Sequence, residues 1–293
     1  MLSTVEKVCQ LSAPLIVALA QSPSVVGVLC IGSYAFEVYD AHSDIDLYVL
    51  CAPEIISETL RQTLFGAIPG VTELHLHQTH AGWASQWSPQ ADRLVLNTMP
   101  FDLSYNTQSW VTNIVHRVTD EGALSLPEFT FRPYTLLGLL ANAIVLYDPF
   151  GVVAQLIAVL MPYPPKLQAQ IIQEKLPILN EWLADLHDCA QREFGVTSFL
   201  FYLWHICDAL HCLLFAINEI YDPAAKRSEQ ELAKLALLPS HFIARYTKLL
   251  EGPFTPTGQR QVVADLTKLA TETIELISMH ERKHDATAPF PLS

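Results

Sequence analysis

The sequence is short of positive charge. It holds 17 Lys and Arg residues against 30 Asp and Glu residues, a formal net charge of −13 at pH 7, and the basic residues are scattered. Because nucleic-acid backbones are bound by clustered Lys and Arg, this balance argues against DNA as a partner and disfavours tRNA. A polyanionic ligand would need a bound cation to screen the carboxylates.

Paired cysteines and targeting signals are also missing. No Cys-x-x-Cys motif occurs, and most of the six cysteines lie in apolar stretches: Cys9, Cys30, Cys51, Cys189, Cys207 and Cys212. We interpret them as reduced core residues. The N-terminal segment has no basic region followed by an apolar stretch and a cleavage site, so we expect no secretion signal and a cytoplasmic location.

One apolar run is long enough to suggest a membrane span. Residues 199–217 are almost continuously apolar, but His205, Asp208 and His211 interrupt them. An Asp at a bilayer centre costs about 2.5–3.5 kcal/mol, and no positive flank marks an inside end. We therefore expect no membrane partner. The run is predicted to be a helix at the centre of a bundle, with four aromatic side chains in its core: Phe199, Phe201, Tyr202 and Trp204.

The chain is long and rich in apolar residues. Its 293 residues favour two domains, and its apolar content of 51% suffices for a sizeable core. Three prolines in the run 161–165 fix the backbone and remove donors, which is typical of a linker. We predict a catalytic domain over 1–161 and a helical domain over 166–293.

Hydrophobic periodicity predicts the elements of both parts. We expect strands at 25–31, 47–50, 71–77 and 143–147, and one strand within 94–105 that is bent at Pro100. Helices are expected at 2–21, 53–68, 108–118, 134–142, 150–160, 166–194, 197–221, 226–250 and 258–284. The predicted fold class is α+β: a mixed, twisted sheet with helices on one side, followed by an all-helical bundle.

The stretch 28–50 carries the chemistry. A buried strand ends at Gly32-Ser33, where glycine lets a ligand approach the backbone and a following helix would aim N–H groups at an anion. The Ser33 hydroxyl can add a hydrogen bond to a phosphate. Asp44 and Asp46 then follow at positions i and i+2 of a strand. Their carboxylates therefore share a face, with Cα atoms about 7 Å apart.

Two carboxylates on one face repel each other, and a divalent cation between them removes that repulsion. Oxygen ligands of this kind suit Mg²⁺, which completes its shell with waters and nucleotide phosphates. Asp102 lies between apolar residues on a segment that could pair beside the first Asp strand. A third carboxylate there would complete a two-metal clamp.

These residues resemble the nucleotidyltransferase superfamily of DNA polymerase beta. The resemblance rests on Gly-Ser, on an Asp-x-Asp that begins twelve residues after the Gly, and on a later lone Asp. It covers residues 25–50 and the strand at Asp102. The small size and the helical second half resemble the aminoglycoside and lincosamide nucleotidyltransferases.

The resemblance implies a transferase that uses Mg²⁺, with two ions, and a nucleoside triphosphate as donor. It implies that Asp44, Asp46 and Asp102 are the metal ligands and catalytic residues. It assigns nucleotide binding to Gly32, Ser33, Ser43 and Lys226, the last on a segment similar to an interhelical loop whose Lys often faces the phosphates. Asp102 would either bind the second ion or take the acceptor's proton, and both roles stay open.

One position departs from the family pattern. Many relatives place a second glycine where this chain has Glu37. The position often needs a backbone conformation that a Glu adopts only at a cost of about 1 kcal/mol or more. Alternatively, Glu37 would serve as a cap or would reach the site as a fourth carboxylate.

The acceptor is expected to be a small, neutral or cationic hydroxylated molecule, such as an antibiotic. An acidic cleft attracts cations and repels polyanions, and nearby aromatic rings offer flat surfaces: Trp83, Trp87, Tyr105 and Trp110. Two alternatives remain, namely modification of a protein or tRNA, and a non-catalytic nucleotide sensor. His75, His77 and His80 are interpreted as solvated rather than as metal ligands. The preferred base and the oligomeric state are not indicated.

Overall fold

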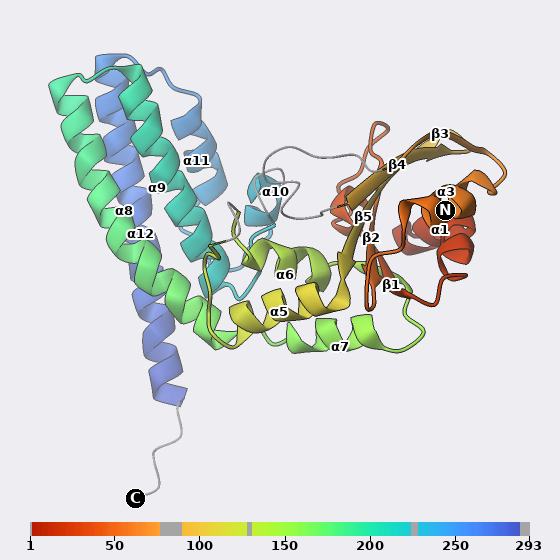
Figure 1. Cartoon of the computed structure of the whole chain (residues 1–293). Coiled ribbons are helices and arrows are strands. Elements are labelled where there is room, and N and C mark those ends of the chain that lie inside the picture. The colour runs from red at the N-terminus through yellow and green to blue at the C-terminus, as the bar shows by residue number, and fades with distance from the viewer. Residues whose placement is uncertain (1, 77–89, 128–130, 224–227, 288–293) are drawn as a thin grey trace, which may run out of the picture. The chain divides into compact units, whose positions relative to one another are not determined.

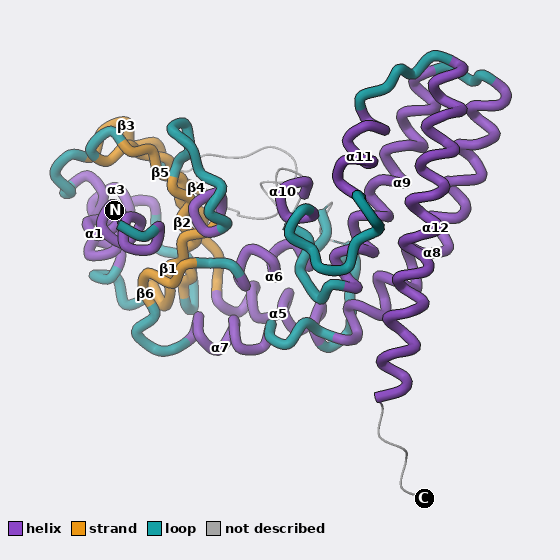
Figure 2. Tube along the Cα trace, turned by 180° about the vertical axis from the view of Figure 1, so that it is seen from behind, coloured by secondary structure: helices purple, strands orange, loops and turns teal. Residues whose placement is uncertain are grey.

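The computed structural model describes residues 2–76, 90–127, 131–223 and 228–287. The chain forms two compact units, Met1–Pro164 and Pro165–Ser293. The first unit combines strands with helices, and the described part of the second contains helices only (Figures 1 and 2). The predicted fold class, a mixed sheet followed by a helical part, is confirmed.

Unit 1 is built on a six-stranded sheet with the order β3-β4-β5-β2-β1-β6. Its strands are β1 (Val25–Ile31), β2 (Ile45–Cys51), β3 (Val71–His75), β4 (Gln90–Leu96), β5 (Met99–Thr107) and β6 (Ile144–Tyr147). The β2–β5 pair is parallel and the other neighbouring pairs are antiparallel. Every residue of β1 is buried, as its continuous apolar run predicts.

Helices cover both faces of this sheet, whereas one covered face was expected. The described residues of unit 1 contain the helices α1 (Thr4–Leu19), α2 (Gly32–Ala35), α3 (Glu58–Gly66), α5 (Gln108–Thr119), α6 (Tyr134–Ala141) and α7 (Val152–Val159). Apolar side chains of α1 and α3 share a core with Ile45, Leu47 and Val49. On the opposite face, α7 approaches so closely that a Cβ at Gly27 would meet Val153. The cause is the almost continuous apolar run of β2, which is buried on both faces.

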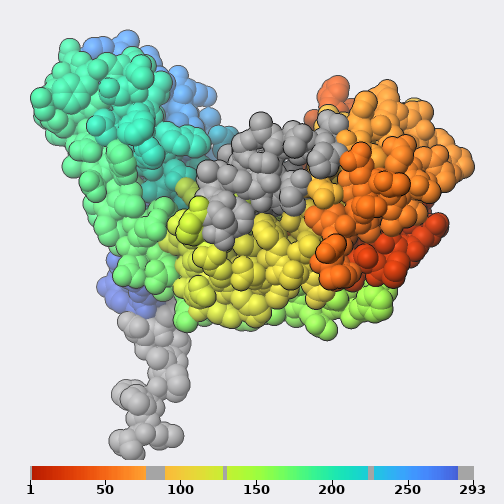
Figure 3. All heavy atoms as spheres, in the orientation of Figure 1, coloured from red at the N-terminus to blue at the C-terminus, as the bar shows by residue number. Residues whose placement is uncertain are grey.

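Helix α5 illustrates how the second face is covered. Its apolar stripe points inward and is buried, while its other side forms part of the outer surface (yellow in Figure 3). The stripe is Val111, Ile114, Val115 and Val118. The spacing of three to four residues is that of an amphipathic helix, and it explains why this helix was predicted almost to its bounds.

The segment expected to be one strand bent at Pro100 is a hairpin of two strands. β4 and β5 pair antiparallel around Asn97-Thr98. Both turn residues have positive φ, 48° and 74°, as a two-residue hairpin turn requires. Pro100 lies near the start of β5, where a proline is tolerated. The prediction was wrong because Asn-Thr lacks the glycine that usually marks such a turn.

Unit 2 consists of α8 (Pro165–Arg192), α9 (Val196–Ile217), α10 (Ser228–Leu232), α11 (Phe242–Leu250) and α12 (Pro256–Thr287). α8, α9 and α12 lie side by side (Figures 1 and 2). The helix expected over 226–250 is two helices instead. The Asn218 side chain both accepts from the Leu237 N–H and donates to its carbonyl, at 2.8 and 3.0 Å, which holds the connecting loop in place.

Helix α9 is only partly the core helix that was expected. Among the described helices, α9 is long and apolar enough to span a bilayer. However, 61% of its apolar 18-residue stretch is buried inside the fold. A core helix passes the same test. Phe199 is buried, whereas Phe201 and Trp204 are 54% and 62% exposed. The prediction that all its aromatic side chains lie in the core was therefore wrong.

All six cysteines are free thiols. Five are buried, in line with the interpretation as core residues, whereas Cys9 is exposed, so the interpretation was wrong for Cys9. Burial, followed by the nearby charge of Asp46, raises the pKa of Cys30 to about 12. This thiol therefore stays protonated at neutral pH and is a poor nucleophile.

A buried ion pair joins α3 to β4. Arg61 Nε lies 2.8 Å from Asp92 Oδ2, and both side chains are fully buried. Arg61 Nη1 also donates to the Ile56 carbonyl and to Gln90, each at 2.6 Å. Its guanidinium lies 4.8 Å from the centre of the Tyr105 ring. This network fixes which face of β4 points toward α3.

Replacing Asp92 should destabilise unit 1 strongly. Asp92→Asn leaves the Arg61 charge buried without its partner, which costs about 3–5 kcal/mol. Asp120→Asn is the matched control, because Asp120 pairs with His116 at the surface and such pairs contribute about 1 kcal/mol or less. Urea unfolding followed by circular dichroism measures both. Equal effects of the two variants would show that the buried pair does not stabilise the fold.

Candidate metal and nucleotide site

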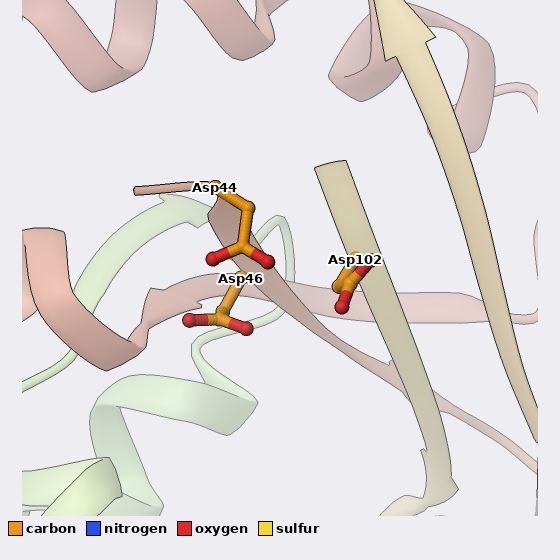
Figure 4. A group of neighbouring side chains, drawn as sticks. All are labelled: Asp44, Asp46 and Asp102. Carbon is orange, nitrogen blue, oxygen red and sulfur yellow. The ribbon is translucent and has the colours of Figure 1, made fainter. Parts of the chain in front are cut away.

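Asp44, Asp46 and Asp102 come together at one end of two neighbouring strands. Asp44 directly precedes β2, and Asp46 lies within it. Parallel pairing of β2 with β5 places Asp46 opposite Asp102. One carboxylate oxygen of each residue lies within 4.8 Å of the others, and all three side chains are partly exposed. Figure 4 shows them projecting from neighbouring strands. Among the described residues, no other group of three or more acidic, His or Cys side chains lies close enough together to hold a metal ion.

The alternation of β2 explains why the carboxylates share a face. Ile45, Leu47 and Val49 are buried in the core with α1 and α3. Successive side chains of a strand point to opposite faces. Asp46 therefore points away from this core, as Asp102 does from the adjacent position on β5. The face that Asp44 and Asp46 were expected to share follows from this alternation.

The donor set fits a hard divalent cation. Mg²⁺ binds oxygens at 2.0–2.1 Å in octahedral geometry, so its ligands lie about 3 Å apart when adjacent and about 4.2 Å apart when opposite. Oxygens within 4.8 Å of one another need only small side-chain rotations to meet these values. Three carboxylates supply oxygen ligands alone, which Mg²⁺ prefers over softer metals.

Position 32 accommodates only a glycine without strain or overlap. Its φ is +74°, in the left-handed region, and a Cβ on it would overlap the Asp46 carboxylate. Sequence reasoning predicted that a ligand approaches this glycine. In the structure the group that approaches it is Asp46, so the glycine makes room for a member of the acidic triad.

In the turn after Gly32, Glu37 adopts the backbone conformation for which relatives often use glycine. The φ of Glu37 is +58°. The Val38 N–H donates to the Ser33 carbonyl and the Glu37 N–H to the Tyr34 carbonyl, at 3.0 and 3.2 Å, which is the hydrogen-bond pattern of a Schellman helix end. Glu37 occupies the position where glycine is common. Its side chain is exposed and is not a member of the metal-competent group.

Aromatic stacking and a polar turn hold the loop that leads to Asp44. The rings of Tyr34 and Tyr39 stack with centroids 4.2 Å apart, and Lys7 Nζ lies 4.5 Å from the Tyr39 ring centre. Ser43 Oγ accepts from the Asp40 N–H and donates to Asp40 Oδ1, at 2.9 and 3.1 Å. The Ser43 hydroxyl thus orders this loop, and its predicted contact with nucleotide stays a prediction.

Arg93 is a site residue that sequence reasoning missed. Its Nε and Nη2 donate to the two oxygens of Asp102 at 2.7 and 2.8 Å. These bonds, followed by the charge of Asp102, raise the pKa of Arg93 above its usual range. Arg93 and Asp102 are cross-strand partners placed symmetrically about Asn97-Thr98. Recognition of that turn would have paired them from the sequence alone.

The structure describes only some of the other residues that the sequence singled out. Tyr105 is fully buried beside Arg61, so it cannot offer a flat surface to an acceptor, and that expectation was wrong. Trp110 is half-buried on α5 and His75 is exposed at the end of β3. The other predicted residues lie outside the described residues: Lys226, Trp83, Trp87, His77 and His80.

No protein-family model and no curated protein matches the sequence. Among solved structures, the chain is similar to the crystal structure of a nucleotidyltransferase-like protein from Exiguobacterium sibiricum 255-15. The match covers 97% of this chain and 82% of that chain at 10% sequence identity, with a TM-score of 0.44. A likeness at this level carries no activity across, so the function proposed below rests on the side chains of this chain.

Replacing Gly32 should be more damaging than replacing another left-handed glycine. Gly151 has a φ of +71° and nothing within 4 Å of its Cβ position. Gly151→Ala should therefore cost only the backbone strain of about 1–2 kcal/mol. Gly32→Ala adds the overlap with Asp46 and should cost clearly more in urea unfolding. If Gly32→Ala and Gly151→Ala lowered the free energy of unfolding equally, the close approach of the Asp46 carboxylate to Gly32 would be contradicted.

Proposed function

We propose that this protein is a Mg²⁺-dependent nucleotidyltransferase that moves a nucleoside monophosphate from a nucleoside triphosphate to a hydroxyl of a small molecule. The observation that carries the proposal is the convergence of Asp44, Asp46 and Asp102, with ligand oxygens within 4.8 Å of one another. Gly32, at the end of the buried strand β1, lies directly against this triad. A carboxylate cluster beside a strand-to-helix turn suits a cation that carries phosphates.

Asp44 and Asp46 would hold the cation that accompanies the triphosphate. The bound Mg²⁺ supplies positive charge that offsets the phosphates and the negative charge of the leaving pyrophosphate. Gly32 and Ser33 would position the β- and γ-phosphates through backbone N–H groups and the Ser33 hydroxyl. Lys226 is predicted to contact the same phosphates. Asp102 would hold a second cation or accept a proton.

The proposed reaction is an in-line displacement. A bond forms between the acceptor hydroxyl oxygen and the α-phosphorus, while the bond from that phosphorus to its bridging oxygen breaks and pyrophosphate leaves. The hydroxyl proton passes to a general base, for which Asp102 is one candidate. The protein would act mainly by positioning the reactants and neutralising charge.

The charge of the chain supports a small acceptor over a nucleic acid. The net charge of −13 and the acidic triad favour neutral or cationic molecules near the site and repel polyanions. The Tyr105 ring is buried, so it offers no stacking surface to such an acceptor. The proposed acceptor is therefore a neutral or cationic hydroxylated molecule, with an antibiotic as one example.

Asp46→Asn should abolish transfer and leave the fold intact. Asp46 is partly exposed, and loss of one cation ligand removes several kcal/mol of transition-state stabilisation, or about 100-fold or more in rate. Transfer from labelled nucleoside triphosphates and Mg²⁺-dependent nucleotide binding are measured side by side. Asp120→Asn, which removes a carboxylate outside the triad, serves as control. If Asp46→Asn transferred nucleotide at the wild-type rate, the triad would have no role in the mechanism.

Parallel reactions with different acceptors test the substrate class. The protein is incubated with Mg²⁺ and each labelled nucleoside triphosphate, with total tRNA in one reaction and with aminoglycosides or lincosamides in another. We expect label on a small molecule, because the acidic chain repels polyanions. Label on tRNA alone would contradict this assignment. Label on protein would identify a protein-modifying enzyme, and nucleotide binding without any transfer would identify a sensor.

A further inference from the structure

Arg93 makes a two-point contact with the third carboxylate of the triad. Its Nε and Nη2 donate to Asp102 Oδ1 and Oδ2 at 2.7 and 2.8 Å. A forked, charge-assisted pair of this kind is stronger and more directional than a single hydrogen bond. Both oxygens of Asp102 are thus engaged by one guanidinium, which is always positively charged in proteins.

The position of Arg93 is set by the buried ion pair on the other face of β4. Asp92 is buried with Arg61 from α3. Neighbouring strand residues point to opposite faces, and a slip of one residue would exchange them. The burial of Asp92 therefore turns Arg93 toward the face that carries Asp102. The arrangement is built into the sheet and does not depend on a flexible loop.

The charges of the site fit one cation in addition to Arg93. Three carboxylates carry three negative charges, and Arg93 offsets one of them, which leaves the charge that a single divalent ion neutralises. Each carboxylate oxygen has two acceptor sites, so Asp102 can share such an ion with Asp44 and Asp46 while it remains bonded to Arg93. A second ion on Asp102 would have to compete with the guanidinium for the same oxygens.

We propose that Arg93 takes the place of a second divalent cation in the nucleotide-free protein, holding Asp102 and limiting the triad to one ion. This inference rests on the proposed function and deepens it. The second ion would then enter together with the triphosphate, whose negative charges compensate the added positive charge. Arg93 acts here as a positioning residue, since it touches Asp102 and not the reacting atoms.

Binding of Mn²⁺ alone tests this proposal without any turnover. Mn²⁺ is titrated into the nucleotide-free full chain, and free ion is followed by electron paramagnetic resonance. We expect one Mn²⁺ per wild-type chain. Arg93→Met should bind a second ion, or bind Mn²⁺ at least about tenfold more tightly, since a positive charge beside the ligands is gone. Arg93→Lys keeps the charge but loses the fork, and should bind between these two.

Controls separate this proposal from the proposed function. Arg260→Met removes a surface Arg of unit 2 and should bind Mn²⁺ as the wild type does. The Arg93 side chain is 59% exposed, so the Arg93→Met variant should remain folded, and urea unfolding checks this. If Arg93→Met bound Mn²⁺ like the wild type, or if the wild type bound two ions, the role of Arg93 would be refuted while the triad remained a metal site. If Asp46→Asn also bound Mn²⁺ normally, the proposed function would fail with it.

Discussion

Parallel pairing of β2 with β5 is the constraint on which the site depends. It sets Asp46 opposite Asp102, with Asp44 at the end of β2, and so gathers three negative charges at one end of the sheet. Apolar packing elsewhere holds these strands together despite the repulsion, because Ile45, Leu47 and their neighbours are buried in a core with α1 and α3. The proposed cation binding and the contact of Arg93 with Asp102 both relieve this repulsion.

The segment between β1 and β2 contains two residues with an unusual backbone conformation. Gly32 and Glu37 both have positive φ, one to make room for the Asp46 carboxylate and the other to end the short helix α2. For Glu37, which is not a glycine, this conformation is costly and persists because the surrounding structure enforces it. The stacked Tyr34 and Tyr39 then anchor the loop that leads to Asp44. Of Gly32 and Glu37, Gly32 is the one that lies directly against a carboxylate of the triad.

Local patterns in the sequence predicted the parts of the site that depend on local structure. The bounds of β1 and the shared face of Asp44 and Asp46 follow from a strand and its period of two, whereas the unusual backbone at Glu37 was suggested only by the family resemblance. Arg93 was missed because its partner is determined by a hairpin turn without glycine. The inward position of Tyr105 was missed although the alternation of β5 carries it, because Phe101, Leu103 and Tyr105 share the buried face, opposite to that of Asp102.

The central claim, that the three carboxylates bind the cation of a nucleotide, is tested most directly by locating that cation. Crystals grown with Mn²⁺ and a non-hydrolysable nucleoside triphosphate analogue would show the ion by its anomalous scattering. The account predicts a Mn²⁺ peak in coordination with Asp44 and Asp46, with phosphate oxygens of the analogue completing its shell. An analogue bound elsewhere on the chain, with no Mn²⁺ at these two carboxylates, would contradict it.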